Sequence, residues 1–348
     1  MRILLVTFAN RNSSDMGVGC YFNQIADILE KEGHELIFFN HPTPLRIEKT
    51  TLSRTIIPMF SGMTSTRFAK VFEATKPDAV HIQTEVGLGI SARHYCVKNG
   101  IPFSTAYHTH WDIGMKHWAH LPASLIWSYL RWYYKPASLI HTNSPQAMQL
   151  LRNKGIQNPV EVFPPGVDLT KFYYDPKPSV LSGYPRPYFM SFCRIAREKN
   201  LEAFLDLSLP GTKFVIGHGP HKKYLQKKYE GKAVFLPQEN EFLPYENLRT
   251  ILSAGDVYVF PSRFDSFGFT NLEALACGLP IAAYPMMGPI NIIEQGVSGY
   301  ISENLQEAAL ACLSLKKEAC IERASHYSWT NTAHNFLKHQ IVLTSSPA

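Results

Sequence analysis

Short apolar segments alternate with amphipathic helical segments in two series along this chain, and this alternation constrains its fold more than any other feature. The first series places strands at residues 3–8, 35–40, 79–83, 103–107 and 139–142, with a helix at 19–32. The second series places strands at residues 188–192, 213–216, 233–236, 257–260 and 281–284. Such alternation is typical of parallel sheets covered by helices. The sequence therefore predicts an α/β protein with two Rossmann-like sheets.

A proline-rich stretch separates the two series. Seven prolines lie between residues 159 and 187, in a segment with weak periodicity that is typical of a connection between domains. We expect a first domain at 1–168, a second at 169–326 and a C-terminal segment at 327–348. The apolar spacing of that last segment, from Trp329 onward, predicts an amphipathic helix.

Composition places the chain among globular proteins, with 45% hydrophobic and 18% charged residues. No apolar run approaches the roughly 20 residues that span a bilayer. We therefore expect a cytoplasmic protein, and no nucleic-acid partner. The net charge of +6 arises mainly before residue 166, where 16 Lys and Arg face 11 Asp and Glu, against 18 and 17 afterwards. This excess fits a solvated surface, or attraction to a membrane or an anionic acceptor.

The six cysteines are scattered and form no CxxC pair. We expect them to be reduced and mostly buried, with neither a disulfide framework nor a metal site.

The strongest functional signal is the segment Phe264–Pro280. Gly268 permits close approach of the backbone, and a helix is predicted to begin at about Phe269. The free N–H groups at a helix start attract phosphate. Asp265 precedes this helix and Glu273 lies within it, so the two acids can hydrogen-bond different hydroxyl groups of one ligand. The structural alternative is an Asp N-cap followed by an exposed helical Glu.

Two further strand ends of the second series carry groups suited to an anion. Residues 191–201 contain Arg194 and Lys199, whose charges suit a diphosphate leaving group. The alternative is an exposed basic loop. The turn after the next strand contains Gly217 and Gly219, which we expect to permit its bend.

The first half offers weaker signals. Gly17, in the loop Asp15–Gly19, is a candidate for a diphosphate contact, although a plain helix start is the alternative and the third glycine of a dinucleotide fingerprint is missing. Farther along, polar residues follow two of the predicted strands. Glu85 lies at the end of the third strand, and the end of the fourth carries His108, His110 and Asp112.

A zinc site is another interpretation of His108, His110 and Asp112, which follow the fourth strand. They lack a clear further ligand, and no cysteine pair accompanies them, so we predict no bound metal. Structural histidines remain the alternative for His108 and His110. Residues 111–135 are rich in aromatic and basic side chains, which suit a bilayer interface and a buried helix hairpin with a basic rim equally well.

Taken in order, these segments resemble the retaining family 4 glycosyltransferases, in the branch that contains sulfolipid and glycosyl-diacylglycerol synthases. The acids at 265 and 273 match the two family glutamates that flank seven residues, and residues 194–199 are similar to the family's Gly-Arg…Glu-Lys pattern. The sequence departs from the common pattern at three positions, with Asp265 in place of Glu, Cys193 in place of Gly and His218 in place of Asp.

The resemblance implies the GT-B architecture. In that architecture two Rossmann-like domains face a cleft, the first domain binds the acceptor, the second binds a nucleotide sugar, and the C-terminal helix crosses back to the first domain. It further implies that Asp265 and His108 contact the transferred sugar and that Glu273 contacts the ribose. The remaining donor contacts would be Gly17, Gly217, Gly219, Gly268 and Phe269, and the acceptor contacts Glu85, His110 and Asp112.

The hypothesis is therefore a retaining transfer of a hexose-type sugar from a UDP- or GDP-sugar to a hydroxyl acceptor, either a lipid or a glycan, without a tightly bound cofactor. The resemblance implies same-face displacement in which Arg194 and Lys199 stabilise the departing diphosphate. Two alternatives remain: a sugar-nucleotide epimerase, which needs no acceptor, and a catalytically silent nucleotide-sugar-binding protein. Besides the cytoplasm, the inner face of a membrane is the alternative location for the protein.

Overall fold

The computed structural model describes residues 1–8, 18–40, 65–108, 111, 121–177, 180–239, 243–263 and 265–343. The chain forms two compact units, one of Met1–Pro164 with Trp329–Ala348 and one of Pro165–Ser328. Within the described residues, no helix has the length and apolarity needed to cross a membrane.

The first unit is built on a six-stranded parallel sheet with the strand order β2-β1-β3-β4-β5-β6. Its strands are β1 (Arg2–Val6), β2 (Glu35–Phe39), β3 (Ala79–Ile82), β4 (Ser104–Tyr107), β5 (Leu139–Thr142) and β6 (Val160–Val162). Its helices are α1 (Val18–Lys31), α3 (Ser65–Thr75), α4 (Leu88–Lys98), α6 (Ala123–Tyr134), α7 (Pro145–Asn153) and α15 (Trp329–Lys338).

The second unit has its own six-stranded parallel sheet, with the order β12-β11-β10-β7-β8-β9. Its strands are β7 (Tyr188–Phe192), β8 (Thr212–Ile216), β9 (Val234–Leu236), β10 (Val257–Phe260), β11 (Ile281–Ala283) and β12 (Gly299–Ile301). Its helices are α8 (Leu201–Leu205), α9 (Lys222–Lys228), α10 (Tyr245–Ala254), α11 (Phe269–Ala276), α12 (Met287–Ile292), α13 (Leu305–Cys312) and α14 (Lys317–Ser325), together with the 3₁₀ turn Arg197–Lys199.

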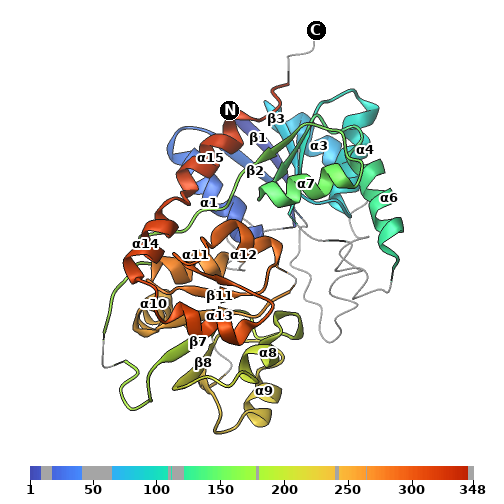
Figure 1. Cartoon of the computed structure of the whole chain (residues 1–348). Helices are drawn as coiled ribbons and strands as arrows, with labels where there is room; N and C mark the ends of the chain where they lie inside the picture. Colours follow the sequence, from blue (N-terminus) through green and yellow to red (C-terminus); the bar gives the residue numbers. More distant parts are fainter. Residues whose placement is uncertain are drawn as a thin grey trace. The chain divides into compact units, whose positions relative to one another are not determined.

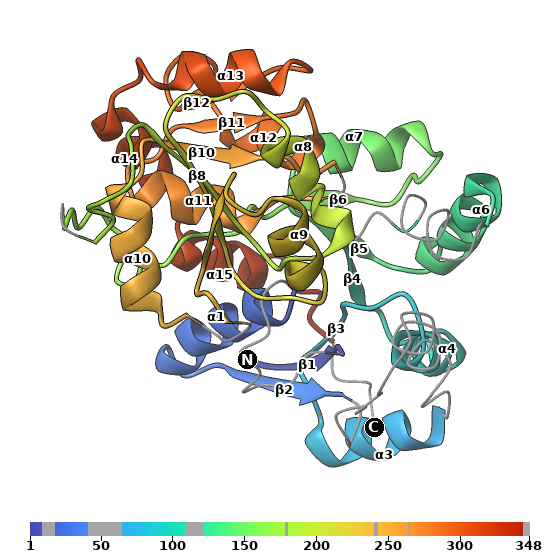
Figure 2. The ribbon, with the colours of Figure 1, turned by 90° about the horizontal axis from the view of Figure 1, so that it is seen from below.

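The second sheet is covered on both faces, because successive residues of a strand point to opposite sides. Tyr258 and Phe260 of β10 pack in one apolar cluster with α10, α11, α12 and α14. Val257 and Val259 of the same strand pack in a second cluster with α8, α9 and α13. Figure 2 shows α11 and α13 on opposite sides of β10 and β11. Buried on both faces, these strands read as continuous apolar runs.

Two strands were not predicted. Strand β6, at Val160–Val162, lies inside the proline-rich stretch that was interpreted as a connection, and β12, at Gly299–Ile301, has only three residues. Both lie at the edges of their sheets. Segments this short contain too few residues for an apolar periodicity to stand out.

Helix α15 belongs to the first unit although it follows the whole of the second in sequence, and it lies alongside α1 (Figure 1). The Phe336 ring lies 5.8 Å from that of Phe22 on α1 and 5.1 Å from the imidazole of His81 on β3. The Thr332 hydroxyl donates to the carbonyl of Pro164 at 2.6 Å. The chain beyond the helix pairs with β3 through an antiparallel bridge. The C-terminal helix therefore completes the core of the first unit.

Replacing Phe336 with Ala is expected to lower the free energy of unfolding by about 3 kcal/mol, since it leaves a cavity between α15, α1 and the sheet. Urea unfolding followed by circular dichroism measures the change. The matched control is Asn335→Ala, an exposed neighbour on the same helix, which is expected to stay within about 0.5 kcal/mol of the wild type. Equal unfolding midpoints for the two variants would contradict the packing role of Phe336.

Candidate functional site

The ends of β7, β8, β9 and β10 lie side by side at the carboxyl edge of the second sheet, because these strands are neighbours and parallel. Open α/β sheets bind their ligands at this edge. Arg194 and Lys199 follow β7, Gly217 and Gly219 follow β8, and Asp265 follows β10. The structure thus brings the main residues predicted from the second half of the sequence to one edge.

A partly buried ion pair lies at the centre of this edge. The Lys199 ammonium is 2.5 Å from Asp265 Oδ1, and both side chains are about one-fifth exposed, at 22% and 21%. Burial alone would lower the pKa of Lys199, but the charge and hydrogen bond of Asp265 outweigh burial and raise it. Lys199 is therefore a cation at neutral pH. The Asn200 amide donates to the carbonyl of Pro261 at 3.0 Å and holds this loop against the end of β10.

Arg194 has a different partner. Its guanidinium forms an exposed ion pair with Glu198, one turn farther along the same loop. Glu198 belongs to the motif at residues 194–199, but no role was predicted for it. Because an exposed ion pair contributes little to stability, the Arg194 guanidinium can exchange the Glu198 carboxylate for another anion at a small cost in free energy.

Helix α11 begins at Phe269, as the sequence predicted, and its start is fixed by close packing. Gly268 has a φ of 82°, in the left-handed region, and a Cβ there would lie 2.6 Å from the Asn271 amide nitrogen. The Tyr258 hydroxyl donates to the carbonyl of Phe192 at 2.7 Å, which ties the strand below α11 to the end of β7.

Three polar groups on α11 and the loop before it are buried without a hydrogen-bond partner among the described residues. They are Asp265 Oδ2, Glu273 Oε2 and both amide atoms of Asn271. Burial raises the pKa of Glu273 to about 7. Unpaired buried polar atoms are uncommon in folded proteins, and a polar ligand is one physical reason for them. Asn271 is fully buried and was missed by sequence reasoning, which gives no signal for which side of a helix meets a ligand.

The turn after β8 lies directly against the backbone that follows β7. A Cβ on Gly217 would lie 2.1 Å from the carbonyl oxygen of Cys193, and one on Gly219 would lie 2.3 Å from that of Ile195. The Ile195 amide donates to the carbonyl of His218 at 2.8 Å, so His218 serves the turn through its backbone. The two glycines are thus required by close approach.

Replacing Gly219 with Ala is expected to lower the free energy of unfolding by about 3 kcal/mol or more, because backbone must move to admit the methyl group. The control is Gly231→Ala: Gly231 also has a positive φ, of 69°, but has nothing within 4 Å of its Cβ position. That control is expected to cost about 1 kcal/mol of backbone strain. Urea unfolding compares the two, and equal losses would show that the close approach is unimportant.

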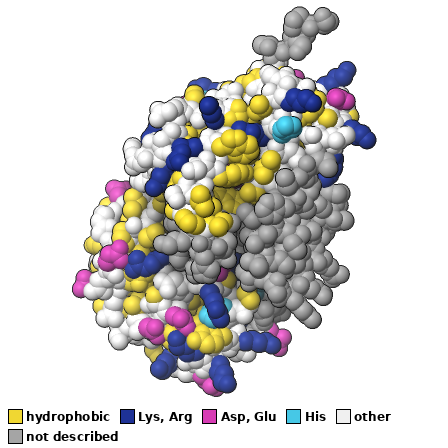
Figure 3. All heavy atoms as spheres, turned by 90° about the vertical axis from the view of Figure 1, so that its right-hand side faces the viewer, with side chains coloured by type: hydrophobic (Ala, Val, Ile, Leu, Met, Phe, Trp, Pro, Cys, Tyr) yellow, Lys and Arg dark blue, Asp and Glu magenta, His cyan; other side chains and the backbone are white. Residues whose placement is uncertain are grey.

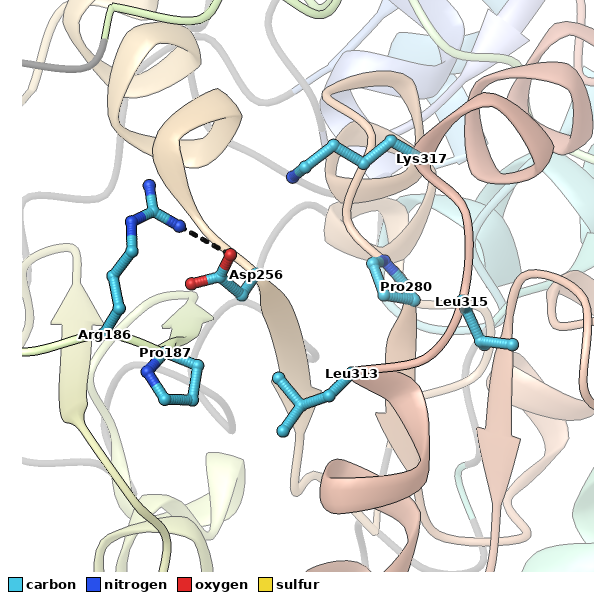
Figure 4. A pocket seen from close by; sticks show the side chains of 7 residues that line it. All are labelled: Arg186, Pro187, Asp256, Pro280, Leu313, Leu315 and Lys317. Atoms are coloured by element: carbon cyan, nitrogen blue, oxygen red, sulfur yellow. Dashed lines mark hydrogen bonds and ion pairs between the residues drawn. The ribbon is translucent and has the colours of Figure 1, made fainter.

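A separate hollow of about 350 Å³ lies at the opposite, amino edge of the second sheet (Figure 4). Its charged groups already have partners within the protein. Arg186 Nη1 lies 2.6 Å from Asp256 Oδ1, and the Lys317 ammonium donates to the carbonyl of Gly255 at 2.7 Å. It contains none of the predicted site residues. We therefore place the candidate site at the carboxyl edge.

In the first unit, His108 follows β4, with its ring 5.1 Å from that of Tyr21. Burial lowers the pKa of His108 to about 4, so its imidazole is neutral at ordinary pH, and its Nε2 is buried without a partner among the described residues. Behind it, His81 and His141 stack at 4.8 Å and were missed by sequence reasoning.

Glu85 is buried, with 3% of its surface exposed, beneath α6. The Tyr134 hydroxyl donates to its Oε1 at 2.7 Å, and the Tyr129 hydroxyl donates to its backbone carbonyl. Burial raises the pKa of Glu85 to about 7, although the bond from Tyr134 opposes this. The remaining predicted residues of the first half, Gly17, His110 and Asp112, lie outside the described residues.

Helix α6 presents apolar side chains to solvent. Leu125 is 59% exposed and Trp132 is 49% exposed, and the Arg93 guanidinium lies 4.0 Å from the Trp132 ring. In Figure 3, which views the side on which α6 lies in Figure 1, hydrophobic side chains gather on the upper surface with Lys and Arg side chains beside them. The other face of α6 is buried through Trp127 and Tyr133. The aromatic-basic stretch thus contributes both to the core and to the surface.

Comparison with known proteins gives two family matches. The family described as Glycosyltransferase Family 4 matches residues 16–171, and that described as Glycosyl transferases group 1 matches residues 182–324. The sulfoquinovosyl transferase SQD2 of Arabidopsis thaliana is 28% identical over 245 residues, which cover 65% of this chain and 47% of that protein. The chain spans about half the length of such curated relatives.

Solved structures share the fold. A sucrose-phosphate synthase from Thermosynechococcus elongatus superposes with a TM-score of 0.75 at 17% identity and covers 97% of both chains. HepE of Anabaena, solved with UDP and glucose, gives a TM-score of 0.66 at 16% identity, with 97% of this chain and 98% of that chain covered. The predicted family resemblance and the predicted α/β fold of the GT-B class are confirmed.

Proposed function

Because the chain belongs to the glycosyltransferases, with a Family 4 domain in its first half and a group 1 domain in its second, we propose that it transfers a hexose-type sugar from a nucleoside diphosphate to a hydroxyl group. The observation that carries this proposal is the arrangement at the carboxyl edge of the second sheet. There the Lys199 ammonium pairs with Asp265, and the same edge carries the start of α11 with buried carboxylate and amide atoms that lack partners among the described residues.

These groups suit the parts of a nucleotide sugar. Lys199 and Arg194 provide positive charge for the diphosphate, and the positive end of the α11 dipole adds to it. Asp265 Oδ2 and Glu273 Oε2 are acceptors for hydroxyl groups, one on the sugar and one on the ribose. HepE, which shares the fold, was solved with UDP and glucose, and this supports a UDP-sugar as donor, with a GDP-sugar as the second choice.

We propose the retaining course for the transfer. The bond between the anomeric carbon and the diphosphate oxygen breaks, and the acceptor oxygen bonds to the same face of that carbon. The acceptor proton passes to an oxygen of the leaving phosphate. Lys199 and Arg194 stabilise the negative charge that develops on the diphosphate. The first unit takes the acceptor, with the neutral imidazole of His108 as a hydrogen-bonding group for the sugar, and Glu85, His110 and Asp112 remain the proposed acceptor residues.

The test is a panel of donors: UDP-glucose, UDP-galactose, UDP-N-acetylglucosamine and GDP-mannose. At least one is expected to bind, to raise the melting temperature, and to be slowly hydrolysed. A ligand at one hundred times its Kd should stabilise the fold by about 2.7 kcal/mol. Folded protein that neither binds, hydrolyses nor transfers any of them would contradict the proposal. A rearranged donor without acceptor would indicate an epimerase, and binding without turnover a silent binding protein.

We further propose that the acceptor is a membrane lipid reached from the cytoplasmic face. The exposed Leu125 and Trp132 of α6, with Arg93 beside them, suit a bilayer interface rich in anionic lipid. Sedimentation with vesicles that contain phosphatidylglycerol should recover the protein, and neutral vesicles should recover less. Trp132→Ser should weaken recovery, whereas Tyr224→Ser, at a similarly exposed position of the second unit, should not. Equal recovery of both variants would favour a soluble glycan acceptor.

A further inference from the structure

Lys222, the first residue of α9, is almost completely buried, with 1% of its surface exposed. Its ammonium donates to three backbone carbonyls, those of Gly217 at 3.1 Å, of Glu239 at 2.7 Å and of Pro237. A lysine ammonium has three N–H groups, so these bonds match its full donor capacity. Burying an ammonium is costly unless its hydrogen bonds are made, and here three acceptors face it.

The three carbonyls belong to two different strand ends. Gly217 directly follows β8, and Pro237–Glu239 directly follow β9, the strand that pairs with β8 at the edge of the sheet. Both lie at the carboxyl edge that also carries Lys199. Lys222 therefore fixes the spacing between two backbone segments that line the candidate site.

Helix α9 also holds the carbonyl that lies between those two acceptors. The Gln226 amide donates to the carbonyl of Gln238 at 2.9 Å. Three successive carbonyls, from Pro237 to Glu239, are thus attached to side chains of α9. Hydrogen bonds to each of these carbonyls restrict the motion of the segment, and a restricted segment can bind a flat ligand edge at a lower entropic cost than a mobile one.

We propose that Lys222 is a positioning residue for the nucleoside part of the donor: it fixes residues 237–239 beside the Gly217 turn so that their backbone can receive the base. The inference rests on the proposed function, because it assumes a nucleotide at this edge. The strand order supports it. Lys199 and Asp265 follow β7 and β10, so a diphosphate and sugar held there leave the ends of β8 and β9 for the base.

The test compares Lys222→Met with a matched control, Lys213→Met. Lys213 lies at the amino end of β8, and its ammonium also donates to backbone carbonyls, those of Leu205 and Leu207. Both substitutions remove a partly or fully buried cation that ties backbone segments together, but only Lys222 lies at the candidate site. The probes are UDP, GDP and inorganic pyrophosphate, and calorimetry on the full chain measures each Kd.

Lys222→Met should raise the Kd of the nucleotide that the wild type binds by at least tenfold and should change the Kd of pyrophosphate by less than threefold. At saturating donor, turnover should stay near the wild-type value while KM rises, because ground-state binding is what is lost. Lys213→Met should bind both probes as the wild type does. Should Lys222→Met not fold, Lys222→Gln keeps part of the hydrogen bonding and should show a smaller loss in the same direction.

Three results would overturn the inference. Equal weakening of UDP and pyrophosphate would mean that Lys222 acts through its charge on the phosphates. Equal weakening by Lys222→Met and Lys213→Met would mean a general loss of stability. If both Lys222 variants bind the nucleotide with wild-type affinity, Lys222 has no role in nucleotide binding. A wild type that binds no nucleotide would instead reject the proposed function, and the inference with it.

Discussion

Replacing Lys199 with Met is expected to lower turnover by two to three orders of magnitude, which is the usual cost of removing one group that stabilises developing charge. Lys199 is the cation of the candidate site whose charge is stabilised by a partly buried partner, Asp265, at 2.5 Å. The variant also leaves Asp265 without its counter-ion, so the sugar contact should suffer too. Steady-state rates with the donor that the panel identifies measure the effect.

The control for this prediction is Lys228→Met. Lys228 also forms an ion pair, with Glu202 at 2.9 Å, but both side chains are about 40% exposed or more and neither belongs to the candidate site. Its rate should equal that of the wild type, since exposed ion pairs contribute little. Lys199→Arg should recover part of the lost rate because it keeps the charge. A Lys199→Met enzyme that retains more than a tenth of wild-type turnover would remove Lys199 from the proposed mechanism.

Replacing Glu273 with Gln is expected to change activity and stability in opposite directions. Burial raises the pKa of this carboxyl from 4.5 to about 7, so the folded state disfavours its ionised form. Such a group stabilises the fold fully below the unfolded pKa, and this contribution is lost as the pH rises through the folded value. At pH 8 the ionised carboxylate therefore costs the fold about 3 kcal/mol, because each tenfold change in the protonation equilibrium corresponds to about 1.4 kcal/mol.

The Gln variant removes this cost. Its free energy of unfolding at pH 8 should exceed that of the wild type by about 3 kcal/mol, and the difference should nearly vanish at pH 4, where both side chains are neutral. Donor affinity should fall by about a hundredfold, because a charged acceptor for a ribose hydroxyl is lost. Urea unfolding at the two pH values and calorimetry with the donor measure these effects.

Glu322→Gln is the control, since Glu322 is exposed on α14 and its substitution should alter neither quantity. A Glu273→Gln variant with unchanged stability at pH 8 would mean that the carboxylate is solvated in the folded protein. A variant with unchanged donor affinity would separate Glu273 from the nucleotide. The combined expectation, more stable but less active, is the usual relation between a binding site and the fold that holds it.

Sequence reasoning succeeded for this protein where a rule links local pattern to position in a parallel sheet. Lys199 and Asp265 are 66 residues apart, yet both follow strands of one series, and carboxyl ends of neighbouring parallel strands meet at one edge. The alternation of strands and helices was sufficient to predict this. The same reasoning gave the start of α11 at Phe269, because glycine and the following apolar spacing are local signals.

The contacts that sequence could not predict are those made by side chains after the fold has formed. Glu85 at a strand end looks the same in sequence whether it faces solvent or lies beneath Tyr134, which is 49 positions away. Lys222 reaches carbonyls up to 17 positions ahead, and a carbonyl carries no residue identity. Arg194 was expected to be available to an anion, but its immediate partner is Glu198, a motif residue for which no role was predicted.

The placement of α15 has a consequence for how the polypeptide matures during synthesis. Ribosomes release a chain from its amino end, so the helix that closes the first unit emerges only after residues 165–328 have been made. Until that moment Phe22 lacks its cover, and the imidazoles of His81 and His141 are open to protons. The unit that is translated first is therefore completed last. During synthesis its apolar groove stays exposed until α15 has been made, whereas in a full-length chain that refolds from denaturant α15 is present from the start.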